Sequence, residues 1–253
     1  MMKRNIFFIA FVVSLGGFLF GFDAGIISGV MSYAGPEFNL TEIQSGWVVS
    51  SPSFAAMFAM LFSGRFSDFI GRKPLLIIVA LLYAVSALLS AYANSYEMLY
   101  IARMVGGLAF GAALVLAPIY IAEIATAEDR GKLVTLQQLN IVFGFFAAFL
   151  SNYFFNSYNS TDISFLNDHT VWRWMLGVEF LPAILYFIFL FFIPRSPRWL
   201  IMNGFREKSS NVLFQIHGKE VGQKEILSLE NGIESEPNKI KINIKELFNK
   251  SFR

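Results

Sequence analysis

The sequence of 253 residues contains no cysteine and only two histidines, His169 and His217. The lack of cysteine excludes disulfide bonds and thiolate-bound metals, and two histidines alone make a histidine metal site unexpected. The sequence also shows no nucleophile–base set, no metal-binding cluster and no phosphate-binding loop. We therefore expect no cofactor, no bound metal and no enzymatic activity.

Charged residues are scarce as well, at 15% of the chain, whereas hydrophobic residues make up 55% and include 29 phenylalanines. A soluble domain of this length could not cover so much apolar surface with so few charges. The net charge of +2 gives no indication of nucleic-acid binding. Many of the charges lie at the end of the chain, because residues 204–253 carry nine Lys or Arg and seven Glu. This composition predicts a membrane protein with a polar C-terminal segment.

Six apolar stretches are long enough to cross a bilayer, which requires about 20 helical residues. They lie near residues 6–30, 44–63, 74–94, 98–122, 133–156 and 172–193. Each must be helical, because hydrocarbon offers the backbone no hydrogen-bond partner. We therefore predict an all-α transmembrane bundle over residues 1–203, followed by amphipathic helices over residues 204–253. The first stretch is too long for a signal peptide, and five more spans follow it.

Lysine and arginine are absent from alternate loops. The stretches 31–43, 95–97 and 157–171 contain neither residue. The N-terminal segment and the other loops carry Lys3, Arg4, Arg65, Arg72, Lys73, Arg130, Lys132, Arg195 and Arg198. Because short basic loops stay in the cytoplasm, we expect a multi-pass protein of the plasma (inner) membrane. Its N-terminus and residues 194–253 are expected to be cytoplasmic.

Three ionisable residues lie inside the predicted spans, namely Asp23, Arg103 and Glu179. From the helical rise, Asp23 lies roughly 25 Å above the cytoplasmic start of its span, in a core about 30 Å thick. Arg103 and Glu179 lie roughly 8 and 10 Å below the outer side. The three therefore come to a similar depth, and two interpretations follow. They could form a structural ion cluster, or a proton relay in which Arg103 keeps Asp23 ionised when close and its withdrawal favours protonation.

The loop between the second and third spans combines glycines with charges. Residues 64–74 read GRFSDFIGRKP. Glycine permits a tight reversal, Asp68 can cap a helix N-terminus, and the basic pair Arg72 and Lys73 anchors the membrane face. At this position the sequence resembles the signature loop of the major facilitator superfamily.

Further motifs follow in order and make the sequence similar to the sugar porter branch of that superfamily. They are Arg103-x-x-Gly106-Gly107-x-x-x-Gly111, the run from Pro118 to Glu123, Arg130-Gly131-Lys132, Gln137-Gln138 with Gly144, Trp172-Arg173-Trp174, and Pro194-x-Ser196-Pro197-Arg198-Trp199-Leu200. The resemblance covers residues 6–253. It implies an N-terminal six-helix half built as a 3+3 inverted repeat, followed by a cytoplasmic helical linker. It also implies monosaccharide transport by proton symport through alternating access.

By the same resemblance, charges at the cytoplasmic ends of the spans form a gate network. Its predicted members are Asp68, Arg72, Glu123, Arg130 and Arg198. The alternative is a set of solvated boundary charges, each of which contributes little. The family usually has Glu after the first proline of its Pro-x-Ser-Pro-Arg motif, whereas this chain has Arg195. The charge at one corner of the expected network is therefore reversed.

The fifth span contains amides that suit a neutral polyhydroxyl ligand, although amides also join helices in membranes. By resemblance, Gln138 matches the substrate-binding glutamine of sugar porters. The predicted substrate-binding residues are Phe20, Gln137, Gln138, Ile141 and Phe145. Some pentose transporters have a second glutamine at the position of Phe145, so a phenylalanine here narrows the expected cavity and pentose specificity does not follow.

Sugar porters have two six-span halves, and this sequence resembles only the first. The implied ligands are a monosaccharide and protons, and the implied partner is a C-terminal six-span half. We expect this polypeptide alone to be inactive in transport. A sugar uniporter of the same fold, a sugar sensor and a non-transporting fragment stay open as alternatives. Asp23 disfavours the uniporter, because facilitators resembling this family tend to have an uncharged residue there.

Overall fold

The structure is a computed structural model, and it describes residues 2–159 and 167–235. Helices and short connections make up these residues, which contain no strand. The helices are α1 (Met2–Glu37), α2 (Glu42–Ile70), α3 (Arg72–Ala91), α4 (Tyr96–Ile124), α5 (Arg130–Asn159), α6 (Val171–Gly177), α7 (Phe180–Phe192), α8 (Pro197–Met202), α9 (Arg206–His217) and α10 (Lys219–Ser235). The predicted linker includes α9 and α10, and its residues 236–253 lie outside the described part.

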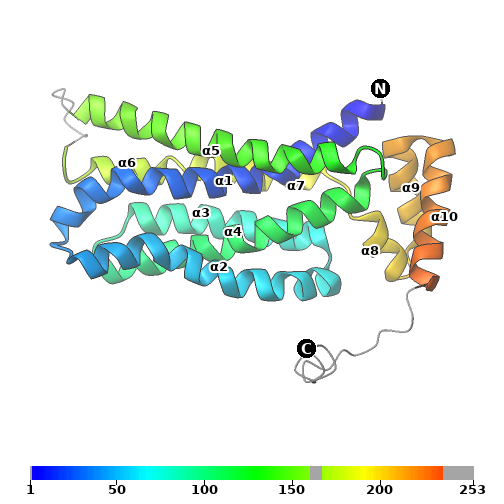
Figure 1. Cartoon of the computed structure of the whole chain (residues 1–253), viewed down its shortest axis with the longest axis horizontal. Coiled ribbons are helices and arrows are strands. Elements are labelled where there is room, and N and C mark those ends of the chain that lie inside the picture. Colours follow the sequence, from blue (N-terminus) through cyan, green and yellow to red (C-terminus); the bar gives the residue numbers. More distant parts are fainter. Residues whose placement is uncertain (1, 160–166, 236–253) are drawn as a thin grey trace, which may run out of the picture.

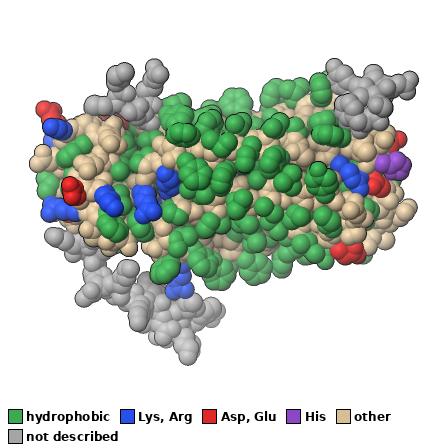
Figure 2. All heavy atoms as spheres, turned by 180° about the vertical axis from the view of Figure 1, so that it is seen from behind, with side chains coloured by type: hydrophobic (Ala, Val, Ile, Leu, Met, Phe, Trp, Pro, Cys, Tyr) green, Lys and Arg blue, Asp and Glu red, His purple; other side chains and the backbone are tan. Residues whose placement is uncertain are grey.

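Helices α1–α5 and the α6–α7 pair form six segments long and apolar enough to cross a membrane, which confirms the six predicted spans. Figure 1 shows them side by side along the long axis, with α8–α10 packed at one end. We call this end, where α1 also begins, the linker end. On the face that Figure 2 shows, hydrophobic side chains cover the middle of the bundle and several Lys and Arg side chains lie at the linker end.

The spans pack in pairs. The most extensive contacts join α1 to α5 and α2 to α4, and α3 packs on both α7 and α6. Spans one to three correspond in order to spans four to six. If each span is replaced by its counterpart, the α1–α5 pair becomes the α4–α2 pair, and the third span still pairs with the sixth. The pairing is therefore that of an inverted repeat of three spans, as the sequence predicted.

Glycine allows two of these pairs to approach closely. A Cβ atom on Gly144 of α5 would lie 2.1 Å from the Phe18 carbonyl oxygen of α1, and one on Gly107 of α4 would lie 2.2 Å from the Pro52 carbonyl oxygen of α2. Both neighbours are backbone atoms, which cannot rotate away. Small residues serve membrane helices in this way because close packing, rather than the hydrophobic effect, holds such helices together.

The sixth span was predicted as one stretch over 172–193, but the structure divides it into α6 and α7. Pro182 causes the interruption, because it has no amide hydrogen for the Val178 carbonyl and its ring would clash with that carbonyl. Leu181 instead donates to the Val178 oxygen at 3.1 Å, and Glu179 donates its amide to the Leu176 oxygen at 3.3 Å. Glu179 therefore lies at a local break in the helix.

We predict that Gly144→Ala lowers the stability of the bundle, because the new methyl group must push α1 away from α5. Overpacking of this kind costs roughly 1–3 kcal/mol. Gly64→Ala in α2 is the matched control, since a Cβ atom there meets nothing within 4 Å. Thermal unfolding of the purified chain in detergent should show a lower midpoint for Gly144→Ala only. Equal midpoints for the two variants would contradict this account of the α1–α5 contact.

Candidate functional site

An ion pair between α1 and α4 lies inside the bundle. Arg103 donates from Nη1 to Oδ1 of Asp23 at 2.7 Å and from Nη2 to Oδ2 at 3.3 Å. Arg103 is 2% exposed and Asp23 is 6% exposed. A buried ion pair is tolerated only when its geometry is good, because both charges have lost their water. The bidentate contact meets that requirement, and it joins two residues that the sequence placed at a similar depth.

Glu179 lies near this pair but is not bonded to it. Its side chain is buried, and it is within electrostatic reach of both Asp23 and Arg103. Within the described part of the chain, the Glu179 carboxylate takes part in no hydrogen bond or ion pair. The Nε atom of Arg103 is also buried without a hydrogen-bond partner. The structure thus brings Asp23 and Arg103 together and leaves Glu179 as a nearby second acceptor. The roles of the three residues stay predictions.

Two buried tyrosines near this site were missed from the sequence. Tyr83 of α3 donates its hydroxyl to the Gly16 carbonyl oxygen of α1 at 3.0 Å. The Tyr186 hydroxyl of α7 is buried without a hydrogen-bond partner, and it lies close to the position that a Cβ atom on Gly16 would take. Tyrosine in an apolar run carries no signal that distinguishes it from an ordinary core residue, so only the fold could reveal this placement.

A second charged cluster lies at the linker end and centres on Arg72. The Arg72 guanidinium contacts Oε1 of Glu123 at 2.8 Å and Oδ1 of Asp68 at 2.8 Å. It also donates to the Ser67 carbonyl oxygen at 3.0 Å. The side chains of Arg72 and Glu123 are 7% and 6% exposed, whereas that of Asp68 is 58% exposed. The buried Arg72–Glu123 pair, which joins α3 to α4, is therefore the central contact of this cluster.

The segment after α7 closes over this cluster. Ser196 donates its hydroxyl to Oε2 of Glu123 at 2.6 Å, and Trp199 donates its indole N–H to the Asp68 carbonyl oxygen at 3.1 Å. Tyr120 of α4 donates to the Pro194 carbonyl oxygen at 2.7 Å. The motif that begins at Pro194 is thus fixed to the ends of α2 and α4. Sequence reasoning included this motif but assigned no contact to Ser196 or Trp199.

Arg130 and Arg198 are the other predicted gate residues. Arg130 is exposed at the start of α5 and forms no ion pair with any described residue. Arg198 lies in α8 and is partly buried. Arg195, which reverses the charge expected at its position, is exposed, and its guanidinium lies 5.6 Å from the centre of the Trp199 ring.

The predicted sugar-binding residues divide into two groups. Gln137 is buried against Gly17 of α1, whereas Gln138 is exposed. Neighbouring helical residues point about 100° apart, so the two amides face different surroundings. Phe20 of α1 lies between two aromatic rings, with centroid distances of 4.8 Å to Phe110 and 6.5 Å to Phe145.

Ile141 packs against Gly17, because a Cβ atom on this glycine would lie 3.1 Å from the Ile141 Cγ1 atom. The structure thus brings Phe20 and Phe145 together, and Gln137 and Ile141 together. Gln138, seven residues before Phe145, lies on the same side of α5 as Phe145, and its side chain is exposed. Sugar binding by these residues stays a prediction.

Comparisons with known proteins agree with this architecture. The family model described as "Sugar (and other) transporter" matches residues 9–253. The chain is 36% identical over its full length to a D-xylose transporter of Levilactobacillus brevis, of which it covers 53%. It is 42% identical over 78% of its length to the galactose-proton symporter of Escherichia coli strain K12, of which it covers 40%.

Solved structures agree as well. The proton:xylose symporter XylE bound to 6-bromo-6-deoxy-D-glucose matches with a TM-score of 0.85 and 32% identity, over 93% of this chain and 55% of that one. An inward open conformation of XylE from E. coli matches with a TM-score of 0.81 and 31% identity, over 92% and 57% of the two chains.

Six paired spans in an inverted repeat define a membrane transporter domain. The chain belongs to the sugar porter family of the major facilitator superfamily, as the motifs predicted. Proteins of this family transport sugars and are not enzymes, so the expectation of no enzymatic activity is confirmed. The chain spans about half the length of the curated relatives it matches, and the structural matches place it on the N-terminal half.

We predict that Glu123→Ala weakens the attachment of the segment after α7, because it removes the carboxylate that accepts from both Arg72 and Ser196. Breaking a buried ion pair in this way costs about 3–5 kcal/mol. Arg130→Ala is the control, since Arg130 is exposed and unpaired among the described residues. Thermal unfolding in detergent should give a lower midpoint for Glu123→Ala alone. A similar loss in the Arg130 variant would mean that the network extends further than these contacts.

Proposed function

We propose that this chain supplies the N-terminal half of a monosaccharide transporter that works by proton symport and alternating access. The observation that carries the proposal is the buried Asp23–Arg103 ion pair between α1 and α4. Intramembrane carboxylates are rare and commonly belong to ion or proton pathways. The names of two relatives, a galactose-proton symporter and a proton:xylose symporter, favour the same coupling ion.

The proposed proton step follows from the cost of burying charge. While Arg103 contacts both oxygens of Asp23, the carboxylate is stable without a proton. When α1 and α4 separate during the transport cycle, Asp23 is left in apolar surroundings, where the neutral acid is favoured. Arg103 then needs another acceptor. Glu179 is within electrostatic reach and makes no hydrogen bond or ion pair with the residues that the structure describes. Proton binding and helix position are therefore coupled through the exchange of one guanidinium between two carboxylates.

The cluster around Arg72 is proposed to hold the linker end closed. Its contacts join α2, α3, α4 and the segment after α7, so the linker end cannot open until some of them break. Arg130 and Arg198 are proposed to belong to the same gate network. Because the loops at the linker end are rich in lysine and arginine, we propose that this end faces the cytoplasm and that the host membrane is the plasma membrane.

The sugar is proposed to bind between this half and a second six-span half. The exposed amide of Gln138 can reach a ligand on the surface of the bundle, whereas Gln137 is enclosed by α1 and α5. The Phe20–Phe145 contact supplies an apolar wall beside it. Relatives that are about twice as long as this chain support the need for a second half, without which the chain is proposed to be inactive.

We predict that Asp23→Asn abolishes sugar accumulation but spares exchange, because the amide cannot release a proton in the transport cycle. The chain would be co-expressed with the C-terminal half of the E. coli galactose-proton symporter, and labelled sugar uptake and external pH would be recorded. Glu97→Gln, at an exposed carboxylate of α4, is the control and should accumulate sugar normally. Accumulation by Asp23→Asn at the level of the unchanged chain would refute proton coupling at this residue.

We also predict that Gln138→Ala raises the KM for sugar about tenfold, because a ligand hydroxyl loses its amide partner, which is worth about 1.4 kcal/mol. The measurement is the concentration dependence of uptake in the same co-expressed system. Leu139→Ala is the matched control, since Leu139 is the next exposed residue of α5 and has no polar group to offer. If both variants change the KM equally, the effect is on helix packing rather than on sugar binding.

A further inference from the structure

Two cationic side chains lie beside each other at the linker end, at the boundary of the apolar band. Lys73 donates from Nζ to the carbonyl oxygens of Phe191 and Ile193, at 2.9 and 2.7 Å. Arg195 follows Ile193 by two residues and is within electrostatic reach of Lys73. The Arg195 guanidinium lies over the Trp199 ring. Neither cation forms an ion pair with a carboxylate in residues 2–159 or 167–235.

This pair differs from Arg72, the residue next to Lys73. Arg72 is buried and has two carboxylates as partners. The carbonyl oxygens at the end of α7 use two of the three hydrogens of the Lys73 ammonium group, and the forked donors of Arg195 make no hydrogen bond within the described chain. Two neighbouring cations repel each other. The arrangement therefore favours an anion that can contact both of them.

A cleft of about 370 Å³ opens at the same turn of the chain. Phe192, Ile193 and Pro194, the three residues before Arg195, line it from the α7 side, Phe8 and Ile9 line it from α1, and Gln215 and Ile216 line it from α9. The Phe192 side chain is 72% exposed. The cations thus lie next to a cleft between the spans and the linker helix α9, where apolar side chains and the Gln215 amide meet.

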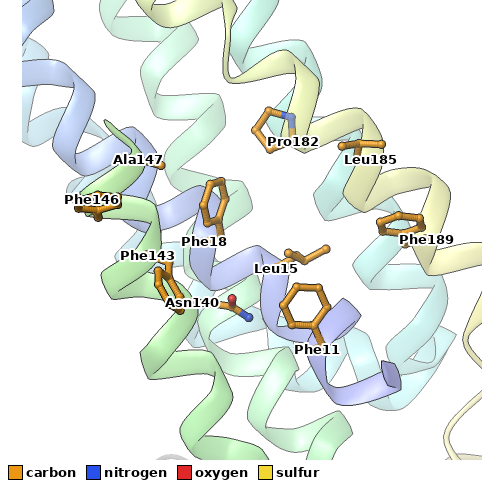
Figure 3. Close-up of a pocket in the computed structure, with 10 residues that line it drawn as sticks. All are labelled: Phe11, Leu15, Phe18, Asn140, Phe143, Phe146, Ala147, Pro182, Leu185 and Phe189. Atoms are coloured by element: carbon orange, nitrogen blue, oxygen red, sulfur yellow. The ribbon is translucent and has the colours of Figure 1, made fainter. Parts of the chain in front are cut away.

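A larger apolar groove of about 510 Å³ lies further along the same helices, between α1, α5 and α7. Figure 3 shows Leu185 and Phe189 of α7 facing Phe11 and Leu15 of α1 across it. The cleft and the groove adjoin where the rings of Phe8 and Phe189 meet, with centroids 6.4 Å apart. The two hollows and the cations therefore form one series, polar at the membrane boundary and apolar toward the membrane centre.

We propose that this series binds one anionic phospholipid, with its phosphate between Lys73 and Arg195 and an acyl chain in the cleft and groove. The eleven helical steps from Pro182 to Ile193 span about 16 Å, which matches half of a hydrocarbon core about 30 Å thick. An anionic lipid fits better than a zwitterionic one, whose headgroup would add a third cation. The site depends on the membrane-spanning fold and not on the proposed proton coupling.

Native mass spectrometry of the full-length purified chain tests the site. The probes are phosphatidylglycerol and phosphatidylcholine with identical acyl chains, titrated from mixed micelles. We expect the unchanged chain to retain phosphatidylglycerol preferentially. Arg195→Gln should lower its affinity about fivefold, the effect of removing one cation at a membrane surface. Arg65→Gln, at another exposed cation of this end without an ion pair among the described residues, should leave the affinity unchanged.

A loss of equal size in the Arg65 and Arg195 variants, or no preference for phosphatidylglycerol, would overturn the proposal and leave the two cations as determinants of topology alone. The acyl chain is tested by Leu185→Trp, which fills the groove at an exposed position and should also weaken retention. Unchanged retention in that variant would overturn the placement of the chain. Glycerol phosphate should not compete at concentrations equal to the lipid; full competition would show that the site recognises phosphate without a lipid.

Discussion

A carboxylate inside a membrane domain must either contact a cation or bind a proton, and the structure depends on how this constraint is met at Asp23. The two-pronged contact from Arg103 requires α1 and α4 to keep a fixed separation and rotation. These two helices are the most enclosed spans, with 67% and 61% of their apolar windows buried, against 28% for α2 and for α5. The close contacts at Gly144 and Gly107 hold α1 on α5 and α4 on α2. They therefore fix the two helices that carry the ion pair.

In the part of the chain that the structure describes, three ion pairs join the two three-span repeats, whereas the Arg72–Asp68 pair joins α3 to α2 within the first repeat. At the linker end, Arg72 of α3 pairs with Glu123 of α4. In the interior, Asp23 of α1 pairs with Arg103 of α4. At the other end, Glu37 of α1 accepts from Arg173 at 2.9 Å, just after α6 begins. Among the described spans, ion pairs thus join the two repeats at three levels along the membrane normal.

The sequence allowed much of this to be predicted, and the failures have physical causes. The long apolar runs determined the six spans, and counting the helical rise placed Asp23 and Arg103 at one depth. Depth gives no side-chain direction, however, so it could not show that Arg103 contacts Asp23 rather than Glu179. Gln137 and Gln138 were both predicted to bind substrate, and only the packing of α5 on α1 shows that Gln137 is enclosed and Gln138 exposed. Arg72 and Arg130 are both boundary cations, and the contacts of Arg72 with α2 and α4 became visible only in three dimensions. Pro182 did carry a readable signal for the break in the sixth span.

The three ion pairs between the repeats differ in how protonation of the carboxylate would affect them. The Glu37 and Arg173 side chains are 18% and 23% exposed, so water can replace their contact at little cost. The Arg72–Glu123 pair is buried but also holds Asp68 and Ser196, which would partly compensate a lost contact. Among the described residues, the Asp23 and Arg103 side chains bond only to each other, with Glu179 close by. In the proposed mechanism, protonation therefore weakens the Asp23–Arg103 ion pair more than the two ion pairs at the ends of the bundle. Glu179 also lies where Pro182 removes an i to i−4 hydrogen bond from the sixth span, next to the pair whose charges it faces.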